Sequence, residues 1–129
     1  MKKSRLATAA LAGLALFAGY AYAADDAKPE KISGVLIDQA CGGKNMSKDD
    51  PEKAAAGHPM ACAKKESCAK SGYAIISGKS MYKLDKDSAE KATAYLNDKE
   101  HKSTKVTVMG TKDGDMLKVT SIEENKETK

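Results

Sequence analysis

The chain has 129 residues, with 22 Lys or Arg against 18 Asp or Glu, so its formal net charge is +4. It contains no Trp, one Phe and five Tyr. Nucleic-acid binding calls for clustered basic side chains and aromatic rings on which bases stack. This composition supplies neither, and we expect no nucleic-acid partner.

The N-terminal segment has the three parts of a secretory signal peptide in the usual order. Basic residues come first, an apolar run follows over residues 6–18, and small residues end the segment at Ala23. The run is too short and too rich in Ala and Gly for a spanning helix. The sequence therefore predicts a signal peptide over 1–23, a periplasmic or secreted protein, and no membrane association after cleavage.

Cleavage would change both the length and the charge of the chain. Removing the first 23 of 129 residues leaves 106, which is enough for one domain. Loss of Lys2, Lys3 and Arg5 leaves 19 basic residues against 18 acids, so the net charge falls from +4 to +1. We expect a single domain over 31–124, between flexible tails over 24–30 and 125–129.

Three β-rich runs occupy the first two thirds of that domain. Residues 31–38 predict a first strand, in which Gly34 indicates a bulge. Residues 73–77 and 80–84 predict a second and a third strand. The glycine at position 78 favours a tight turn that would pair these two strands as an antiparallel hairpin.

A helix and a second hairpin are predicted after the third strand. Asp87 followed by Glu90 resembles a capping box, and apolar residues at helical spacing continue to Leu96. Alternation over 105–109 and 116–122 predicts two further strands that an Asp-Gly turn would join.

The order of these elements favours a mainly β fold with one or two helices. Five strands with a helix between the third and fourth match a small OB-like barrel. A Cys-bearing helical insertion over 39–71 would lie between the first two strands. The alternative is an open α+β sheet made of the same elements.

The insertion carries all three cysteines, and outside the cytoplasm two of them would form a disulfide. The candidates are Cys41, Cys62 and Cys68. In one continuous helix over 59–69 the last two would lie about 9 Å apart along the axis, which is beyond bridging distance. Either that helix breaks near residues 66–67, or Cys41 is a partner. A Cys41 bridge closes the longer loop and is favoured by chain entropy.

A metal site is the alternative interpretation of the same segment. Three thiols and one imidazole suit tetrahedral Zn, and neighbouring Met thioethers suit Cu(I). This candidate set comprises Cys41, His58, Cys62 and Cys68. No Cys-x-x-Cys pair is present, however, and free thiols are hard to maintain outside the cytoplasm. A third interpretation is a reactive unpaired thiol, left over after one bridge forms.

Three further residues are candidates for the site. Asp38 ends the first strand, where it could orient a histidine or form a turn. Tyr73 and Tyr82 could line a ligand-binding sheet face, although filling a core without Trp is the simpler role. His101 lies among charged residues and is expected to be solvated. We find no nucleophile, base and orienter set, and no phosphate-binding loop.

The chain also resembles a family of small exported bacterial proteins that have no assigned activity. The similarity rests on Gly34 to Asp38, on the Cys and His residues of the insertion, on Cys68 to Tyr73, on Tyr82 to Asp85 and on Val106 to Gly110. It implies an exported OB-like domain, with Asp38, Cys41, His58, Cys62 and Cys68 as the marked positions. The wider spacing between the last two cysteines departs from that family's pattern.

Two functional hypotheses follow. The first is a non-enzymatic periplasmic binding or accessory protein, with no cofactor and a disulfide that stabilises the insertion. Its partner would be a small ligand or another exported protein, and it would be monomeric. The second is a metal-binding (Zn or Cu) or thiol-redox protein that uses the Cys and His cluster.

Overall fold

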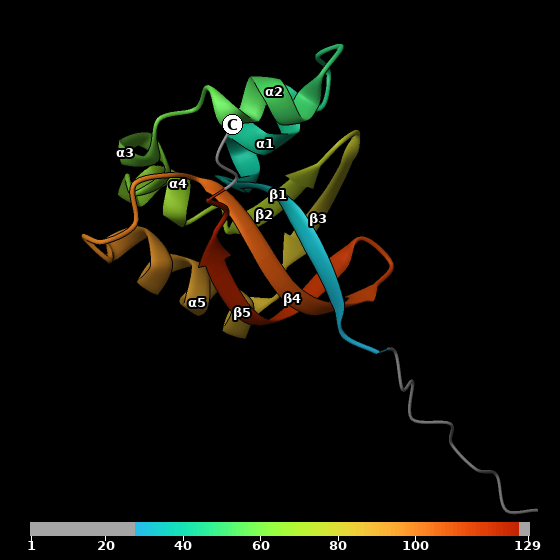
Figure 1. The fold of residues 1–129 in the computed structure, drawn as a ribbon. Helices are drawn as coiled ribbons and strands as arrows, with labels where there is room; N and C mark the ends of the chain where they lie inside the picture. Colours follow the sequence, from blue (N-terminus) through green and yellow to red (C-terminus); the bar gives the residue numbers. More distant parts are fainter. Residues whose placement is uncertain (1–27, 127–129) are drawn as a thin grey trace, which may run out of the picture.

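The computed structural model describes residues 28–126 and shows a closed five-stranded barrel (Figure 1). The predicted signal peptide, most of the predicted N-terminal tail and the last three residues lie outside the described part. The strands follow each other around the barrel in the order β1-β2-β3-β5-β4. Their bounds are β1 Glu30–Asp38, β2 Tyr73–Ser77, β3 Ser80–Leu84, β4 Lys105–Asp113 and β5 Met116–Glu124. The OB-like barrel is thus confirmed, and the open sheet is wrong.

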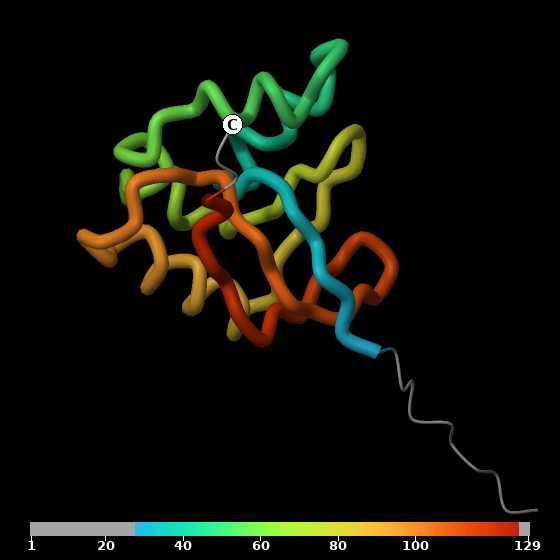
Figure 2. Tube along the Cα trace, viewed as in Figure 1, coloured from blue at the N-terminus to red at the C-terminus, as the bar shows by residue number. Residues whose placement is uncertain are grey.

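The described residues form five helices, which is more than the one or two expected. Four are short and belong to the insertion. Gly57 and Pro59 separate α2 from α3, whereas two lysines separate α3 from α4. Figure 2 follows this path across one side of the barrel. The helices are α1 Gln39–Asn45, α2 Pro51–Ala56, α3 Met60–Ala63, α4 Glu66–Ala69 and α5 Lys86–Asn97.

Strand β1 changes partner along its length. Residues 30–35 pair with β4, and residues 35–38 pair with β2, both antiparallel. Gly34 lies at this change, where an added Cβ would stand 2.3 Å from the carbonyl oxygen of Ile76. The pairing of β1 runs through Gly34 without a register shift, so the predicted bulge is wrong. This glycine is needed because two backbones approach closely there.

The two faces of the barrel wall are both apolar where the insertion lies over it. Leu36 and Ile75 point into the main core, together with residues of β4, β5 and α5. Their neighbours Val35, Ile37 and Ile76 face outward and pack against Ala55 of α2. Because side chains alternate along a strand, the nearly continuous apolar runs of β1 and β2 indicate burial on both sides. The insertion therefore covers the outer face of these strands.

Helix α5 begins two residues before the position that the sequence predicted. Its N-cap is Asp85, whose carboxylate accepts a hydrogen bond from the Ser88 amide at 2.9 Å, rather than Asp87. The hydrogen bonding with Ser88 lowers the pKa of Asp85. The buried Ser88 hydroxyl in turn accepts the Val119 amide at 2.7 Å, which ties the helix to β5. No helix of the described residues is long and apolar enough to cross a membrane.

The close approach at Gly34 can be tested by adding a methyl group. Gly34→Ala should lower the free energy of unfolding by about 2 kcal/mol or more, since the obstacle is backbone that cannot move aside cheaply. Gly43→Ala is the matched control, because its added Cβ in helix α1 meets nothing within 4 Å. This control should be neutral or stabilising by up to about 1 kcal/mol. Equal denaturant midpoints for the two variants would contradict the account.

Candidate metal centre

The site begins at Asp38, the last residue of β1. Its side chain is fully buried (0% exposed) and serves as the N-cap of α1, with Oδ2 accepting a hydrogen bond from the Cys41 amide at 2.9 Å. An N-cap carboxylate satisfies a free amide of the first helical turn. The same bond fixes the position of the Cys41 backbone relative to the carboxylate.

A set of hydrogen bonds joins the start of α1 to the segment that leads into β2. The Gln39 amide donates to the Gly72 carbonyl at 2.9 Å, and the Ala40 amide donates to Ser71 Oγ at 3.2 Å. The Ser71 hydroxyl donates to the Cys68 carbonyl at 2.6 Å. The two ends of the insertion are therefore held together, and Cys68 is brought next to the first turn of α1.

Three potential metal ligands converge at this junction. One carboxylate oxygen of Asp38 and the sulfurs of Cys41 and Cys68 all lie within 4.8 Å of one another. Two sulfurs on a tetrahedral zinc ion with 2.3 Å bonds are about 3.8 Å apart. The observed spacing is thus within about 1 Å of coordination geometry, a distance that small side-chain rotations can close.

His58 also contacts the carboxylate of Asp38. Its Nε2 is 3.2 Å from Asp38 Oδ1, with the histidine side chain 15% exposed. The two atoms are close but not aligned for a hydrogen bond, and among the described residues both are buried without a hydrogen-bond partner. Buried polar atoms without partners are uncommon and mark places where a proton or a ligand completes the structure. His58 does not cap α3, whose N-cap is Pro59.

The electrostatics of the cluster keep Cys41 protonated in the absence of a cation. Burial raises the pKa of the Cys41 thiol, and the neighbouring charge of Asp38 raises it further. A thiol of this kind is a poor nucleophile. The negative charge of Asp38 disfavours a thiolate at Cys41. A cation bound between Asp38, Cys41 and Cys68 would instead favour the thiolate, because each of these three side chains can carry a negative charge.

Cys62 stands apart from this cluster. The helix over 59–69 that was considered from the sequence is broken, since α3 ends at Ala63 and α4 begins at Glu66. Cys62 lies on α3 and is not among the converging ligand atoms. All three cysteines are free thiols in the structure. Of the four residues predicted for a metal site, Cys41 and Cys68 converge with Asp38, and His58 contacts Asp38. Cys62 is separate from them.

The two candidate tyrosines belong to the core. Tyr73 is 2% exposed, and its hydroxyl donates to the Ala63 carbonyl at 3.0 Å. Burial raises its pKa. Tyr82 packs against the same core, with Lys112 Nζ 5.0 Å from the centre of its ring. Neither ring forms an open ligand-binding face.

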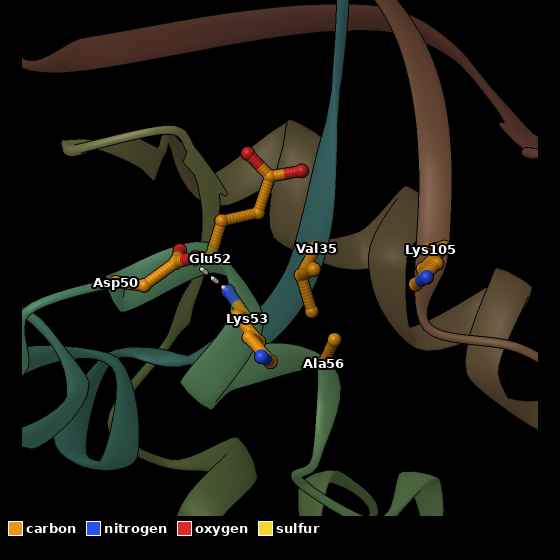
Figure 3. Close-up of a pocket in the computed structure, with 6 residues that line it drawn as sticks. All are labelled: Val35, Asp50, Glu52, Lys53, Ala56 and Lys105. Atoms are coloured by element: carbon orange, nitrogen blue, oxygen red, sulfur yellow. Dashed lines mark hydrogen bonds between the residues drawn. The ribbon is translucent and has the colours of Figure 1, made fainter.

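A separate hollow lies beside α2, with a volume of about 300 Å³ (Figure 3). Two acidic and two basic side chains line it, so it offers no strong preference for an anion or a cation. One acid, Asp50, is engaged as the N-cap of α2 and accepts the Lys53 amide at 3.1 Å (Figure 3). The other, Glu52, accepts the Gly78 amide in the β2–β3 turn. Both acidic side chains of the hollow are therefore engaged in contacts that hold α2 in place.

Comparison of the chain with protein-family models, with curated proteins and with solved structures finds no match. The resemblance to a family of exported proteins stays a prediction.

Sequence reasoning placed Asp38 among the candidates but not among the metal ligands. The signal that could have found it is the spacing Asp38-x-x-Cys41 directly after a strand. An N-cap residue and the third residue after it are in contact by the geometry of the first helical turn. The proximity of Cys68 has no comparable local signal, because it depends on contacts between distant segments.

The raised pKa of Cys41 predicts its reactivity in metal-free protein. Cys41 should react slowly with an alkylating agent around neutral pH, because only the thiolate is nucleophilic. Asp38→Asn removes the neighbouring charge while keeping a good N-cap, so it should lower the Cys41 pKa and speed its alkylation. Peptide-resolved mass spectrometry over a pH series measures this rate. An unchanged or slower rate in the variant would contradict the electrostatic account.

Proposed function

We propose that the protein is an exported, non-enzymatic metal-binding protein that holds one zinc ion through Asp38, Cys41 and Cys68. The observation that carries this proposal is the convergence of the three ligand atoms within 4.8 Å. The buried carboxylate adds to it, since one of its oxygens has no aligned partner among the described residues. A buried carboxylate needs compensation by hydrogen bonds or a cation. A divalent ion supplies that compensation and also stabilises both thiolates.

Zinc suits this donor set better than copper. Thiolate sulfur and carboxylate oxygen are both common zinc ligands, whereas Cu(I) is selected by thiolates and thioethers. Of the two neighbouring thioethers, Met60 packs against the main core, whereas Met46 packs with the outer cluster of the barrel wall, as Cys41 does. The carboxylate oxygen among the three converging donors is what favours Zn²⁺.

His58 supports the same centre, because its buried Nε2 lies next to the Asp38 oxygen that has no aligned partner among the described residues. Metal-binding carboxylates are themselves usually held by a further polar side chain, and loss of such a partner weakens metal binding by about 10- to 100-fold. The 3.2 Å contact to Asp38 Oδ1 gives His58 this position. A small rotation of either side chain would align the hydrogen bond.

Zinc titration of the reduced protein against a chromophoric chelator tests the proposal. The wild type should bind one equivalent. Cys41→Ser, Cys68→Ser and Asp38→Asn should each weaken binding by more than about 100-fold, since each removes a direct ligand. Asp38→Asn retains the N-cap, so a folded variant with lost affinity isolates the ligand role.

Cys62→Ser is the matched control for this titration. It removes a thiol of the same insertion that lies outside the cluster, so it should leave the zinc affinity unchanged. Equal losses in Cys62→Ser and Cys41→Ser, or the absence of zinc binding by the wild type, would contradict the proposal.

A disulfide between Cys41 and Cys68 is the second candidate, favoured by the 4.8 Å limit on the distance between their sulfurs. Export would place these thiols in an oxidising compartment, and a bridge across the insertion would stabilise the fold by about 3 kcal/mol. Here the pair would act as a staple or a redox couple instead of as metal ligands.

Disulfide mapping of protein isolated without reductant separates the two candidates. The second candidate predicts a Cys41–Cys68 linkage with Cys62 free and no bound metal. The first predicts three alkylatable thiols after removal of one equivalent of zinc. A linkage that includes Cys62 would count against both, because it would pull that residue out of the place it has in α3.

A further inference from the structure

We infer that His58 Nε2 is the fourth ligand of the ion held by Asp38, Cys41 and Cys68, and that the resulting centre is closed and structural. The inference rests on the proposed function and goes beyond the supporting role of His58 described above, since the nitrogen itself would bind the ion. Zinc sites with four protein ligands are structural, whereas catalytic sites keep one position for water or substrate. The identity of the fourth donor therefore decides what the ion does.

The contact between His58 and Asp38 has the spacing of two donors on one ion. Nε2 and Oδ1 are 3.2 Å apart, and both are buried without a hydrogen-bond partner among the described residues. On a tetrahedral zinc ion with bonds of about 2.0 Å to each atom, nitrogen and oxygen are about 3.3 Å apart. When Nε2 carries no proton, the two atoms present lone pairs to each other, which is unfavourable unless a cation lies between them. The pair therefore fits a bound metal better than a hydrogen bond.

Helix α2 places His58 beside Asp38. Ala55 of α2 is fully buried in the outer cluster of the barrel wall, and its carbonyl accepts the His58 amide at 2.9 Å. On the other side His58 is followed by Pro59, whose ring restricts the backbone. The backbone is thus constrained on both sides of His58, and such support keeps a metal ligand in position.

The sulfurs must come closer to His58 for all four donors to share one ion. His58 is not among the atoms that lie within 4.8 Å of one another, so at least one sulfur is farther than this from Nε2. Nitrogen and sulfur on one tetrahedral zinc ion are about 3.6 Å apart. Cys41 and Cys68 are both partly exposed, and a change of χ1 rotamer moves a cysteine sulfur by about 3 Å. Rotation of the cysteine side chains can therefore close the site without a shift of the backbone.

No other thiol or imidazole competes for this position. The three cysteines and two histidines of the chain all lie within the described residues. Cys62 belongs to α3, where the next residue is fully buried in the main core and holds this short helix in place. His101 is stacked on Tyr95 of α5, with ring centres 4.0 Å apart. His58 is thus the remaining donor of this kind.

With four protein ligands, the ion would cross-link three segments of the chain. Asp38 and Cys41 lie where β1 meets α1, His58 lies in the α2–α3 connection, and Cys68 lies on α4. Binding at such a site contributes directly to folding, because the donors are not gathered in the unfolded chain. The zinc would therefore stabilise the insertion on the barrel instead of activating a water molecule.

Cobalt(II) substitution with added imidazole tests the fourth ligand. Cobalt-loaded wild type should show the intense d–d bands of a four-coordinate ion and no change when imidazole is added. His58→Ala should retain the charge-transfer band of two thiolates but open one position, so imidazole should restore the wild-type spectrum in a saturable titration. His101→Ala is the matched control and should behave like the wild type.

His58→Gln separates a ligand from a residue that only holds the carboxylate. Its side-chain amide can still donate a hydrogen bond to Asp38, so a positioning role predicts zinc affinity close to that of the wild type. The ligand role predicts that the affinity falls by more than about 10-fold, as in His58→Ala. Nitrogen NMR of ¹⁵N-histidine-labelled wild type adds a readout that needs no variant: zinc should shift the His58 Nε2 resonance and fix the ring proton on Nδ1.

Three results would overturn the inference and leave the proposed zinc binding intact. These are an imidazole response in the cobalt-loaded wild type, an unshifted Nε2 resonance of His58 in zinc-loaded protein, and wild-type zinc affinity in His58→Gln. A complete lack of cobalt and zinc binding by the wild type would instead remove the proposed function and this inference together.

Discussion

The buried carboxylate of Asp38 is the constraint around which the insertion is organised. A charged group at 0% exposure is expensive unless hydrogen bonds or opposite charge offset the loss of water. One oxygen accepts a hydrogen bond from the Cys41 amide, and this bond also caps the start of α1. The other faces His58 without an aligned hydrogen bond. A metal ion shared with two thiolates would complete the compensation.

The barrel positions this carboxylate by fixing both neighbouring strands. Asp38 pairs with Tyr73 at the end of the β1–β2 ladder, so the insertion leaves and re-enters the sheet at one point. The close approach at Gly34 lets β1 pair with β4 first and β2 later. Helices α1 and α2 then cover the outer face of β1 and β2, which gives these strands a second apolar side. The candidate metal ligands Asp38, Cys41 and Cys68 lie at the base of the insertion, where it meets the sheet.

The strands could be predicted from the sequence because their signals are local. Alternating apolar residues and glycine-containing turns located all five, with bounds that differ by at most a few residues. The start of α5 was misplaced because Asp85 and Asp87 are both plausible caps, and only the extended backbone of Asp85 decides between them. The four short helices of the insertion carry too few residues for a periodic pattern to emerge.

The sequence predicted the types of residue at the candidate site but not which of them converge. Residue spacing does not tell which of Cys62 and Cys68 lies near Cys41. In the structure the break between α3 and α4 separates these two cysteines. What distinguishes them is tertiary: Ser71 binds the Cys68 carbonyl next to α1, and Tyr73 holds Ala63 in the core. Such contacts between distant segments leave no pattern in a single sequence.

X-ray absorption at the zinc edge of the loaded, reduced protein tests the central claim most directly, because it reports the donors themselves. The account predicts two sulfur scatterers at about 2.3 Å, with lighter oxygen or nitrogen atoms at about 2.0 Å completing the shell. A shell of light atoms alone would contradict it, since neither thiolate of the Asp38, Cys41 and Cys68 cluster would then bind the metal.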